Sequence, residues 1–196
     1  MKRVSVVGNS GSGKTYFAKL LAQKMECKHI ELDAIFHQEN WTSLGEAEFR
    51  EAVTKATESV SWVIDGNYRT VRDIVWSKAD TVIFLDVGFI KNTFRVVKRS
   101  LFRSVMKAEL WNGNKEKMRN LFSFDPKKSI IAWSISNYKE IKDDMTKSLQ
   151  CNEYENLKFV VLKTRLDQAQ FLKANLSISG SKSTEQNFWF GQELRD

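Results

Sequence analysis

The fold of this 196-residue chain is decided by one stretch, Val4-Ser5-Val6-Val7-Gly8-Asn9-Ser10-Gly11-Ser12-Gly13-Lys14-Thr15. Its first four residues form a short β-branched run that is typical of a buried parallel strand. The next eight match the pattern G-x-x-x-x-G-K-[ST], and apolar residues then recur at helical spacing. The stretch therefore predicts a strand, a phosphate-binding loop (P-loop) and a helix in direct succession.

The composition of this loop suits a bound phosphate group. Glycines let successive backbone N–H groups turn inward around phosphate oxygens, and the helix N-terminus adds partial positive charge. Lys14 is expected to reach the β- and γ-phosphates of ATP, and the Thr15 hydroxyl is expected to ligate Mg²⁺. We expect the nucleotide to be held by Gly8, Asn9, Ser10, Gly11, Ser12, Gly13, Lys14 and Thr15.

The overall composition narrows the class of protein. A net charge of +7 favours anionic partners such as nucleotides or nucleic acid. Apolar runs are far shorter than the roughly 18 residues of a membrane helix, and no secretory signal pattern opens the chain. The two cysteines, Cys27 and Cys151, form neither a disulfide framework nor a metal-ligand pattern. We therefore expect a cytoplasmic protein without a membrane segment.

Strand and helix patterns alternate along the rest of the chain. Expected strands lie at residues 4–7, 29–32, 62–64, 81–85 and 158–162, with helical patterns between them. Such alternation predicts a parallel sheet that is covered on both faces. The predicted fold is a three-layer α/β P-loop NTPase domain over residues 1–176, with sheet order 2-3-1-4-5. Residues 177–196 are polar and are expected to form a flexible C-terminal tail.

The fourth strand is followed by a long basic helix at residues 89–108. Its expected core stripe is Phe94, Val97, Leu101 and Val105, and cations recur at every fourth position at Lys91, Arg95, Arg99, Arg103 and Lys107. Like charges at this spacing repel by roughly 0.2–0.5 kcal/mol per pair, which points to a nearby anion. Residues 103–128 are interpreted as a helical lid over a polyphosphate; the alternative is a basic surface.

Three carboxylates are expected where strands end. Asp65 is a candidate to hold Mg²⁺ through water, and Asp33 is a candidate base or orienting group for an acceptor hydroxyl. Each could instead cap a turn or a helix, and a cap is the favoured interpretation of Asp86. His29 and His37 are assigned no role. Two tryptophans in irregular segments could stack on a base, although packing within loops is favoured for Trp41 and Trp111.

The motifs resemble those of a known superfamily. Asp65-Gly66-Asn67-Tyr68-Arg69-Thr70 is similar to the D-G-F-P-R-T segment of adenylate-kinase-like enzymes, and Arg95 and Arg99 match two arginines of their next long helix. The chain most resembles small bacterial adenylate-kinase-related or DNA topology modulation (FlaR-like) proteins. Their H-L-D-x-x-F, W-x-x-D-G-N-Y and W-N-G-N-x-E motifs correspond to residues 29–36, 62–68 and 111–116.

This resemblance implies roles for several residues. Asp65 would organise Mg²⁺, Arg69 would contact an acceptor phosphate, and Arg95 and Arg99 would contact the base and the phosphates of ATP. Lys14, Asp33 and Arg99 are the expected catalytic residues, and Arg119 in the lid is a further expected substrate contact. Asn67-Tyr68 replaces Phe-Pro, and the adenylate-kinase lid sequence is absent, so the resemblance supports phosphoryl transfer better than it supports AMP as acceptor.

The leading hypothesis is an enzyme that transfers the γ-phosphate of ATP, with Mg²⁺, to a small acceptor such as a nucleotide. The alternative is an ATP-binding regulator that associates with nucleic acid through its basic helix. Nucleic acid is the less favoured partner, because the chain contains no DNA-reading motif. The sequence names neither the acceptor nor an oligomeric state.

Overall fold

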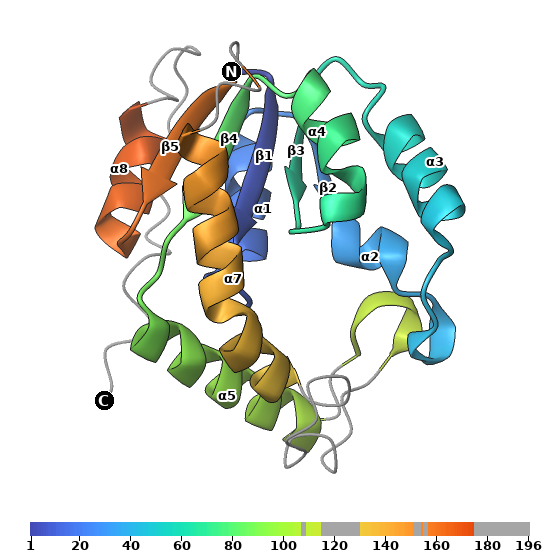
Figure 1. Cartoon of the computed structure of the whole chain (residues 1–196), viewed down its shortest axis with the longest axis vertical. Coiled ribbons are helices and arrows are strands. Elements are labelled where there is room, and N and C mark those ends of the chain that lie inside the picture. The colour runs from blue at the N-terminus through green and yellow to red at the C-terminus, as the bar shows by residue number, and fades with distance from the viewer. Residues whose placement is uncertain (107–108, 115–129, 151–153, 155–156, 175–196) are drawn as a thin grey trace.

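A five-stranded sheet forms the centre of the molecule. The computed structural model describes residues 1–106, 109–114, 130–150, 154 and 157–174 (Figure 1). Every pair of neighbouring strands is parallel, and the order β2-β3-β1-β4-β5 confirms the prediction. The strands are β1 (Arg3–Gly8), β2 (Lys28–Glu31), β3 (Trp62–Asp65), β4 (Thr81–Leu85) and β5 (Lys158–Leu162).

Helices cover both faces of this sheet. On one face, the buried residues of α1 (Lys14–Lys24) and α8 (Arg165–Ala174) form one core with the sheet. On the other face, α3 (Glu46–Ala56), α4 (Arg72–Lys78) and α7 (Ile130–Gln150) contribute to a second core (Figure 1). The remaining described helices are α2 (Leu32–Phe36), α5 (Phe89–Val105) and the 3₁₀ turns η1 (Glu39–Trp41), η2 (Arg69–Val71) and η3 (Trp111–Gly113).

The central strand β1 is rich in valine because helices cover it on both faces. Val6 packs with Phe17 of α1 on one face, whereas Val7 packs with Phe84 and Trp76 on the other face. Because successive side chains of a strand point to opposite faces, a strand that is covered twice is mostly apolar on both faces. The buried polar residue in β1 is Ser5, whose Oγ accepts a hydrogen bond from Trp76 Nε1 over 3.3 Å. This arrangement makes the sheet a rigid base for the loops at its edge.

The strand register brings the predicted site elements together. Val6 is paired with Asp65, and Asp65 is paired with Glu31 across the next ladder. Gly8 ends β1 directly beside the end of β4. The P-loop and two carboxylates therefore meet at the carboxyl edge of the sheet, where open α/β folds bind ligands.

The predicted core stripe of the long helix is wrong. Phe94 is 68% exposed and Val105 is 63% exposed, whereas the buried positions of α5 include Asn92, Val96 and Ser100. This inner face packs against the P-loop rather than against an apolar core. A Cβ at Gly11, whose φ is +85°, would lie 2.6 Å from Val96 and 2.8 Å from the carbonyl oxygen of Asn92, so only glycine permits this approach.

Two of the strand-end carboxylates differ from expectation. Strand β2 ends at Glu31, so Asp33 lies in the first turn of α2. Asp86 does not cap α5, whose N-cap is Gly88; its carboxylate pairs with Lys142 Nζ over 3.1 Å. The expected lid residues 115–128, including Arg119, and the expected tail lie outside the described residues. Within the described part of the chain, no helix is both long and apolar enough to cross a membrane.

Candidate nucleotide and acceptor site

The P-loop is held in shape by its own backbone and by α5. Gly11 and Gly13 have φ values of +85° and +88°, and Gly13 is the N-cap of α1. Such left-handed positions favour glycine, which explains their place in the motif. Asn92 Nδ2 donates to the Ser10 carbonyl over 2.6 Å, and Arg99 Nη2 donates to Ser10 Oγ over 3.0 Å. Helix α5 thus brings a guanidinium group against the loop.

The second element of the site is the carboxylate of Asp65. Thr15 Oγ1, in the first turn of α1, donates to Asp65 Oδ2 over 2.7 Å. The other oxygen, Oδ1, lies 2.7 Å from Nε2 of His29 on β2. The side chain of Asp65 is only 1% exposed, so both of its oxygens have partners inside the protein. Residues from three elements, α1, β2 and β3, are therefore joined at one carboxylate.

Each of the three residues after Asp65 contacts a different part of the site. Gly66 has a φ of +145°, and a Cβ there would lie 2.7 Å from the Cβ of Leu32, so a larger residue would push α2 away. Asn67 forms two hydrogen bonds with the backbone of Gly8, one over 3.0 Å and one over 2.7 Å. Tyr68 donates its hydroxyl to Asp33 Oδ1 over 2.7 Å.

This segment explains the departure from the adenylate-kinase motif. In place of Phe-Pro, the Asn67-Tyr68 pair fixes the start of the P-loop and orients the carboxylate of Asp33. Burial, and next the charge of Asp33, raise the pKa of Tyr68 far above its usual range, so its hydroxyl stays a donor. One oxygen of Asp33 is therefore held by a neutral hydrogen-bond donor.

The segment that follows α5 is docked beside α2 and η1. The ring of Trp111 stacks on His37 with a centroid distance of 5.7 Å, and Trp41 meets His37 edge to face at 5.5 Å. Asn112 donates to the His37 carbonyl over 2.6 Å, and Asn114 bonds to the carbonyl of Gln38 and to the N–H of Trp41, each over 2.8 Å. The two tryptophans thus pack between loops, as the favoured interpretation had it.

Glu31 is a carboxylate that the sequence analysis did not select. It closes β2 opposite Asp65, and burial, then the charge of Asp65, raise its pKa, while a hydrogen bond with the side chain of Trp111 opposes the shift. Burial lowers the pKa of His37, which favours the neutral form of its stacked ring. A second acidic group therefore lies beside Asp65, under the docked segment 111–114.

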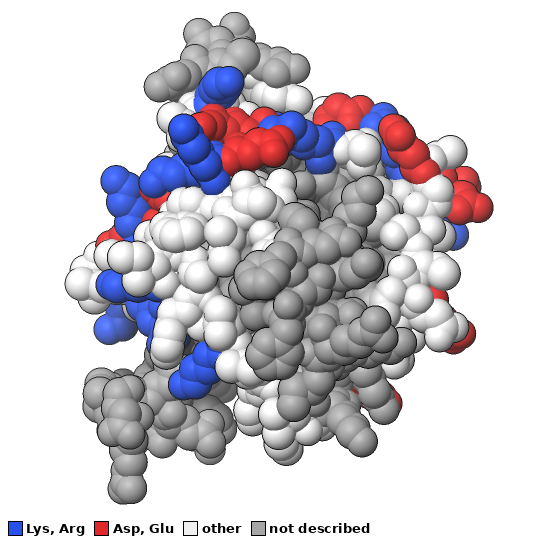
Figure 2. All heavy atoms as spheres, turned by 60° about the horizontal axis from the view of Figure 1, so that its bottom comes forward, with Lys and Arg blue, Asp and Glu red and all other residues white. Residues whose placement is uncertain are grey.

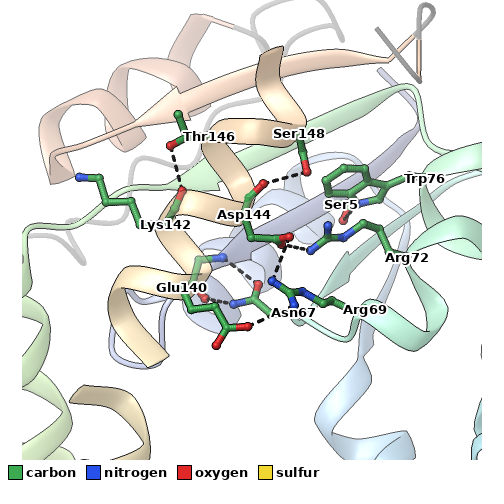
Figure 3. A network of polar contacts seen from close by, with 11 residues as sticks. Ser5, Asn67, Arg69, Arg72, Trp76, Glu140, Lys142, Asp144, Thr146 and Ser148 are labelled. Atoms are coloured by element: carbon green, nitrogen blue, oxygen red, sulfur yellow. Dashed lines mark hydrogen bonds and ion pairs between the residues drawn. The ribbon is translucent and has the colours of Figure 1, made fainter. Parts of the chain in front are cut away.

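Arg69 lies in a network of ion pairs with α7, which covers the face of the sheet opposite to α1 (Figure 3). It pairs with Glu140 Oε1 over 3.1 Å and with Asp144 Oδ1 over 3.0 Å, both on α7. Arg72 also bonds to Asp144, and its guanidinium lies 4.9 Å from the ring centre of Trp76. The arginine expected to meet an acceptor phosphate is thus paired with carboxylates of α7.

The predicted site residues are only partly brought together. The P-loop, Asp65 and Arg99 contact one another directly or through Ser10, and Asp33 joins them through Tyr68 and the Asn67 clamp on Gly8. Arg95 is half-buried on α5, and Arg119 lies outside the described residues. Four further residues of the site were not predicted from the sequence: His29, Glu31, Asn67 and Asn92. Alternation along β2 indicates that His29 and Glu31 share one face of the sheet, but only the pairing of β2 with β3 places them beside Asp65.

The oxygen atoms of the Thr15 and Asp65 side chains are suitable ligands for Mg²⁺. Both side chains present oxygen, the ligand type that Mg²⁺ prefers, and P-loop proteins complete the shell with phosphate oxygens and water. Within the described residues, no group of three or more His, Cys, Asp or Glu side chains could hold a metal ion without such help. The site is therefore suited to a metal that arrives with a nucleotide.

Comparisons with known proteins agree with this geometry. A family profile described as "ATPase family associated with various cellular activities (AAA)" matches residues 4–86, which include the P-loop, Asp33 and Asp65. Shikimate kinase from Acinetobacter baumannii, solved in complex with shikimate, is 14% identical, with 90% of this chain and 91% of that chain covered and a TM-score of 0.54. The chain therefore has the P-loop NTPase fold, with a kinase among its structural neighbours.

Two other solved structures align over similar lengths with lower scores. A sugar kinase from Janibacter sp. is 20% identical over 90% of this chain and 92% of that chain, with a TM-score of 0.46. Shikimate kinase from Bacteroides thetaiotaomicron is 17% identical over 88% of this chain and 94% of that chain, with a TM-score of 0.42. At these identities the likeness concerns the fold alone. No curated protein matches the sequence.

Proposed function

We propose that this protein is an ATP- and Mg²⁺-dependent kinase that transfers the γ-phosphate of ATP to a hydroxyl group of a small acceptor. The observation that carries the proposal is the bond from Thr15 of the P-loop to the buried Asp65, at the edge of the sheet where the D-G-N-Y segment also holds Asp33. A P-loop together with a carboxylate that can bind Mg²⁺, here Asp65, is suited to bind a nucleoside triphosphate. A second oriented carboxylate, here Asp33, is suited to interact with the acceptor.

Each residue has a distinct role in this reaction. Lys14 and the loop N–H groups hold the β- and γ-phosphates, and Arg99, beside Ser10, stabilises negative charge on the transferring group. Thr15 and Asp65 would hold Mg²⁺, which would supply positive charge against the phosphate oxygens. Catalysis in this class rests on positioning and charge neutralisation, which the rigid edge of the sheet supports.

The acceptor side centres on Asp33. Tyr68 holds Oδ1 of this carboxylate, so the group has a fixed orientation from which it can accept the proton of an acceptor hydroxyl. Arg69 would bind an anionic part of the acceptor, and it would have to exchange its partners on α7 to do so. Arg119 is a further candidate contact. A phosphate or carboxylate group on the acceptor would complete this arrangement.

An acceptor screen tests the proposal. ADP formation from MgATP is measured with nucleoside monophosphates, sugars, polyols and hydroxy acids, shikimate among them because of the structural neighbour. We expect one class to stimulate ADP formation and Asp33→Asn to abolish that stimulation while ATP still binds. Tyr68→Phe should lower it less, because Asp33 keeps its charge. Stimulation that is unchanged in Asp33→Asn would contradict the role of Asp33.

DNA-binding measurements on the same protein distinguish the kinase from the alternative, an ATP-binding regulator that associates with nucleic acid. Among the described members of the cation row on α5, only Lys91 is exposed, whereas Arg95, Arg99 and Arg103 are half-buried. Among the described residues in Figure 2, Lys and Arg gather toward one side of the view, and Asp and Glu lie among them at its upper margin. A nucleic-acid regulator requires DNA binding that weakens steeply with salt, by a slope of about −0.9 per neutralised phosphate. Tight binding of this kind without any acceptor-stimulated turnover would favour the regulator.

A further inference from the structure

We propose that His29 is a positioning residue for Asp65 and, through Asp65, for the Mg²⁺ that Thr15 helps to hold. This inference rests on the proposed nucleotide site but not on the identity of the acceptor. It assigns a role to a histidine that lies outside the P-loop motif and that makes no contact with the P-loop among the described hydrogen bonds.

Strand register brings His29 to Asp65. His29 pairs with Val63, and Glu31 pairs with Asp65 two residues further along the same ladder. Because side chains two residues apart share a face, His29 and Asp65 are diagonal neighbours on the face that α1 covers. The imidazole therefore reaches the carboxylate from a rigid strand and not from a loop.

The two oxygens of Asp65 are used separately. Oδ1 lies 2.7 Å from His29 Nε2, and Oδ2 accepts the Thr15 hydroxyl at 2.7 Å. With Asp65 ionised, the carboxylate can only accept, so Nε2 carries the hydrogen of this bond. A carboxylate that is held at one oxygen cannot turn about its terminal bond without losing that partner. His29 thus keeps Oδ2 directed at Thr15.

This orientation matters for the metal because a hydroxyl group has one hydrogen and two lone pairs. While the Thr15 hydroxyl donates to Asp65, its lone pairs are available to a cation. The Asp65 side chain is 1% exposed and that of His29 is 16% exposed, so water has little access to replace the imidazole. Partners of this kind, which orient a metal-associated group, typically change metal affinity about 10–100-fold when they are removed.

A purely structural role for His29 predicts a different result. If the imidazole only completes the packing of β2, its loss lowers the stability of the fold, and any loss of nucleotide affinity is the same with and without metal. A positioning role lowers the metal-dependent part alone. The discriminating quantity is therefore the affinity for Mg²⁺ of the protein saturated with ADP, compared with the affinity for ADP in the absence of metal.

The experiment is calorimetric titration of the full chain with ADP in EDTA, and then of Mg²⁺ into the ADP-saturated protein. For His29→Ala we expect Mg²⁺ to bind about 10–100-fold more weakly while metal-free ADP binding changes less than about twofold. His29→Gln, which keeps an N–H donor of similar reach, should recover part of the loss. Lys28→Gln, an exposed neighbour on β2, should match the wild type.

Asp65→Asn completes the test as a double-mutant cycle. If His29 acts through Asp65, His29→Ala should weaken Mg²⁺ binding no further in the Asp65→Asn background. Unchanged Mg²⁺ affinity in His29→Ala, or equal and additive losses in both backgrounds, would overturn the proposal. If His29→Ala does not fold, His29→Gln against His29→Asn, whose amide is too short to reach Oδ1, makes the same comparison.

The wild-type titration separates this inference from the proposed function. Wild-type protein that does not bind ADP refutes the nucleotide site itself, and with it the role of His29. Wild-type protein that binds ADP with a Mg²⁺ dependence that His29→Ala leaves intact refutes only the role of His29. A wild-type chain that responds as expected but phosphorylates no acceptor refutes the kinase proposal and leaves the role of His29 supported.

Discussion

The carboxamide of Asn67 lies across the backbone of Gly8, accepting its N–H at Oδ1 over 3.0 Å and donating from Nδ2 to its carbonyl over 2.7 Å. Gly8 is the last residue of β1 and the first of the P-loop, so this pair joins the segment after β3 to the start of the loop. Loss of the amide should therefore disturb the nucleotide site more than an ordinary loop substitution.

Asn67→Ala should lower the free energy of unfolding by about 1–3 kcal/mol, because it leaves the partly buried N–H and C=O of Gly8 without these partners. Metal-free ADP should also bind more weakly, since the first turn of the loop loses its clamp. Urea unfolding and calorimetry measure the two effects. Gln23→Ala, which removes an exposed amide from α1, is the control and should change neither. Wild-type values for Asn67→Ala would contradict this role.

A second prediction concerns pH and the network around α7. Burial raises the pKa of Asp144, but its bonds to Arg72 and Arg69 outweigh this effect and hold its pKa below the usual value. A carboxyl group whose pKa is lowered by folding stabilises the protein above its unfolded pKa, near 3.9. That contribution is lost as the pH falls through the lower pKa of the folded state.

Asp144→Asn should therefore reduce stability by about 1–3 kcal/mol at pH 7 and by progressively less as the pH falls below about 4. Urea unfolding at pH 7, 5 and 3.5 gives the three values. The neighbouring carboxylate Asp143 is exposed on the same helix, and Asp143→Asn is the matched control. A difference between wild type and Asp144→Asn that stays constant with pH would show that the ion pairs do not couple folding to protonation.

Truncating a side chain should lower the stability of the protein much more on the buried face of α5 than on its exposed face. Val96→Ala removes a buried side chain that packs against Gly11, and should cost about 1–3 kcal/mol of stability. Phe94→Ala removes a larger side chain that is mostly exposed, and should change stability by less than about 0.5 kcal/mol. Thermal or urea unfolding compares them directly. A larger loss for Phe94→Ala would mean that this ring is covered in solution.

The contact between segment 109–114 and η1 predicts slow exchange of particular amide hydrogens. The N–H of Leu110 bonds to the carbonyl of Asn114, and the N–H of Trp41 bonds to the side chain of Asn114. We expect both amides to be protected without nucleotide, and Asn114→Ala to speed exchange at Trp41 about tenfold. An open lid in the absence of ATP predicts the reverse, with protection only after a non-hydrolysable ATP analogue is added.

The P-loop could be predicted because its motif is a local signal, and the sheet order followed from the fold class that this motif and the strand–helix alternation indicate. The G-x-x-x-x-G-K-[ST] motif defines β1 and the start of α1, and apolar runs mark the other strands. The inner face of α5 could not be predicted in this way. Its buried Asn92 donates a hydrogen bond to the Ser10 carbonyl. Because this inner face includes polar side chains, a search for apolar residues selects the wrong face of the helix.

The candidate site was also only partly predictable. Asp65 could be selected as the acid that follows a buried strand, but its contact with His29 depends on how β2 pairs with β3. Pairing register is a tertiary property that one strand does not encode. The same holds for Arg69, whose partners Glu140 and Asp144 lie about 70 positions further along the chain.

The most direct test of the central claim is the turnover of Lys14→Ala with MgATP and the best acceptor from the screen. Lys24→Ala, at the exposed end of the same helix, is the matched control. If the P-loop delivers the γ-phosphate, ADP formation by Lys14→Ala should fall at least about 100-fold, with an unchanged unfolding midpoint. Turnover and ATP binding equal to those of the wild type and of Lys24→Ala would contradict the account.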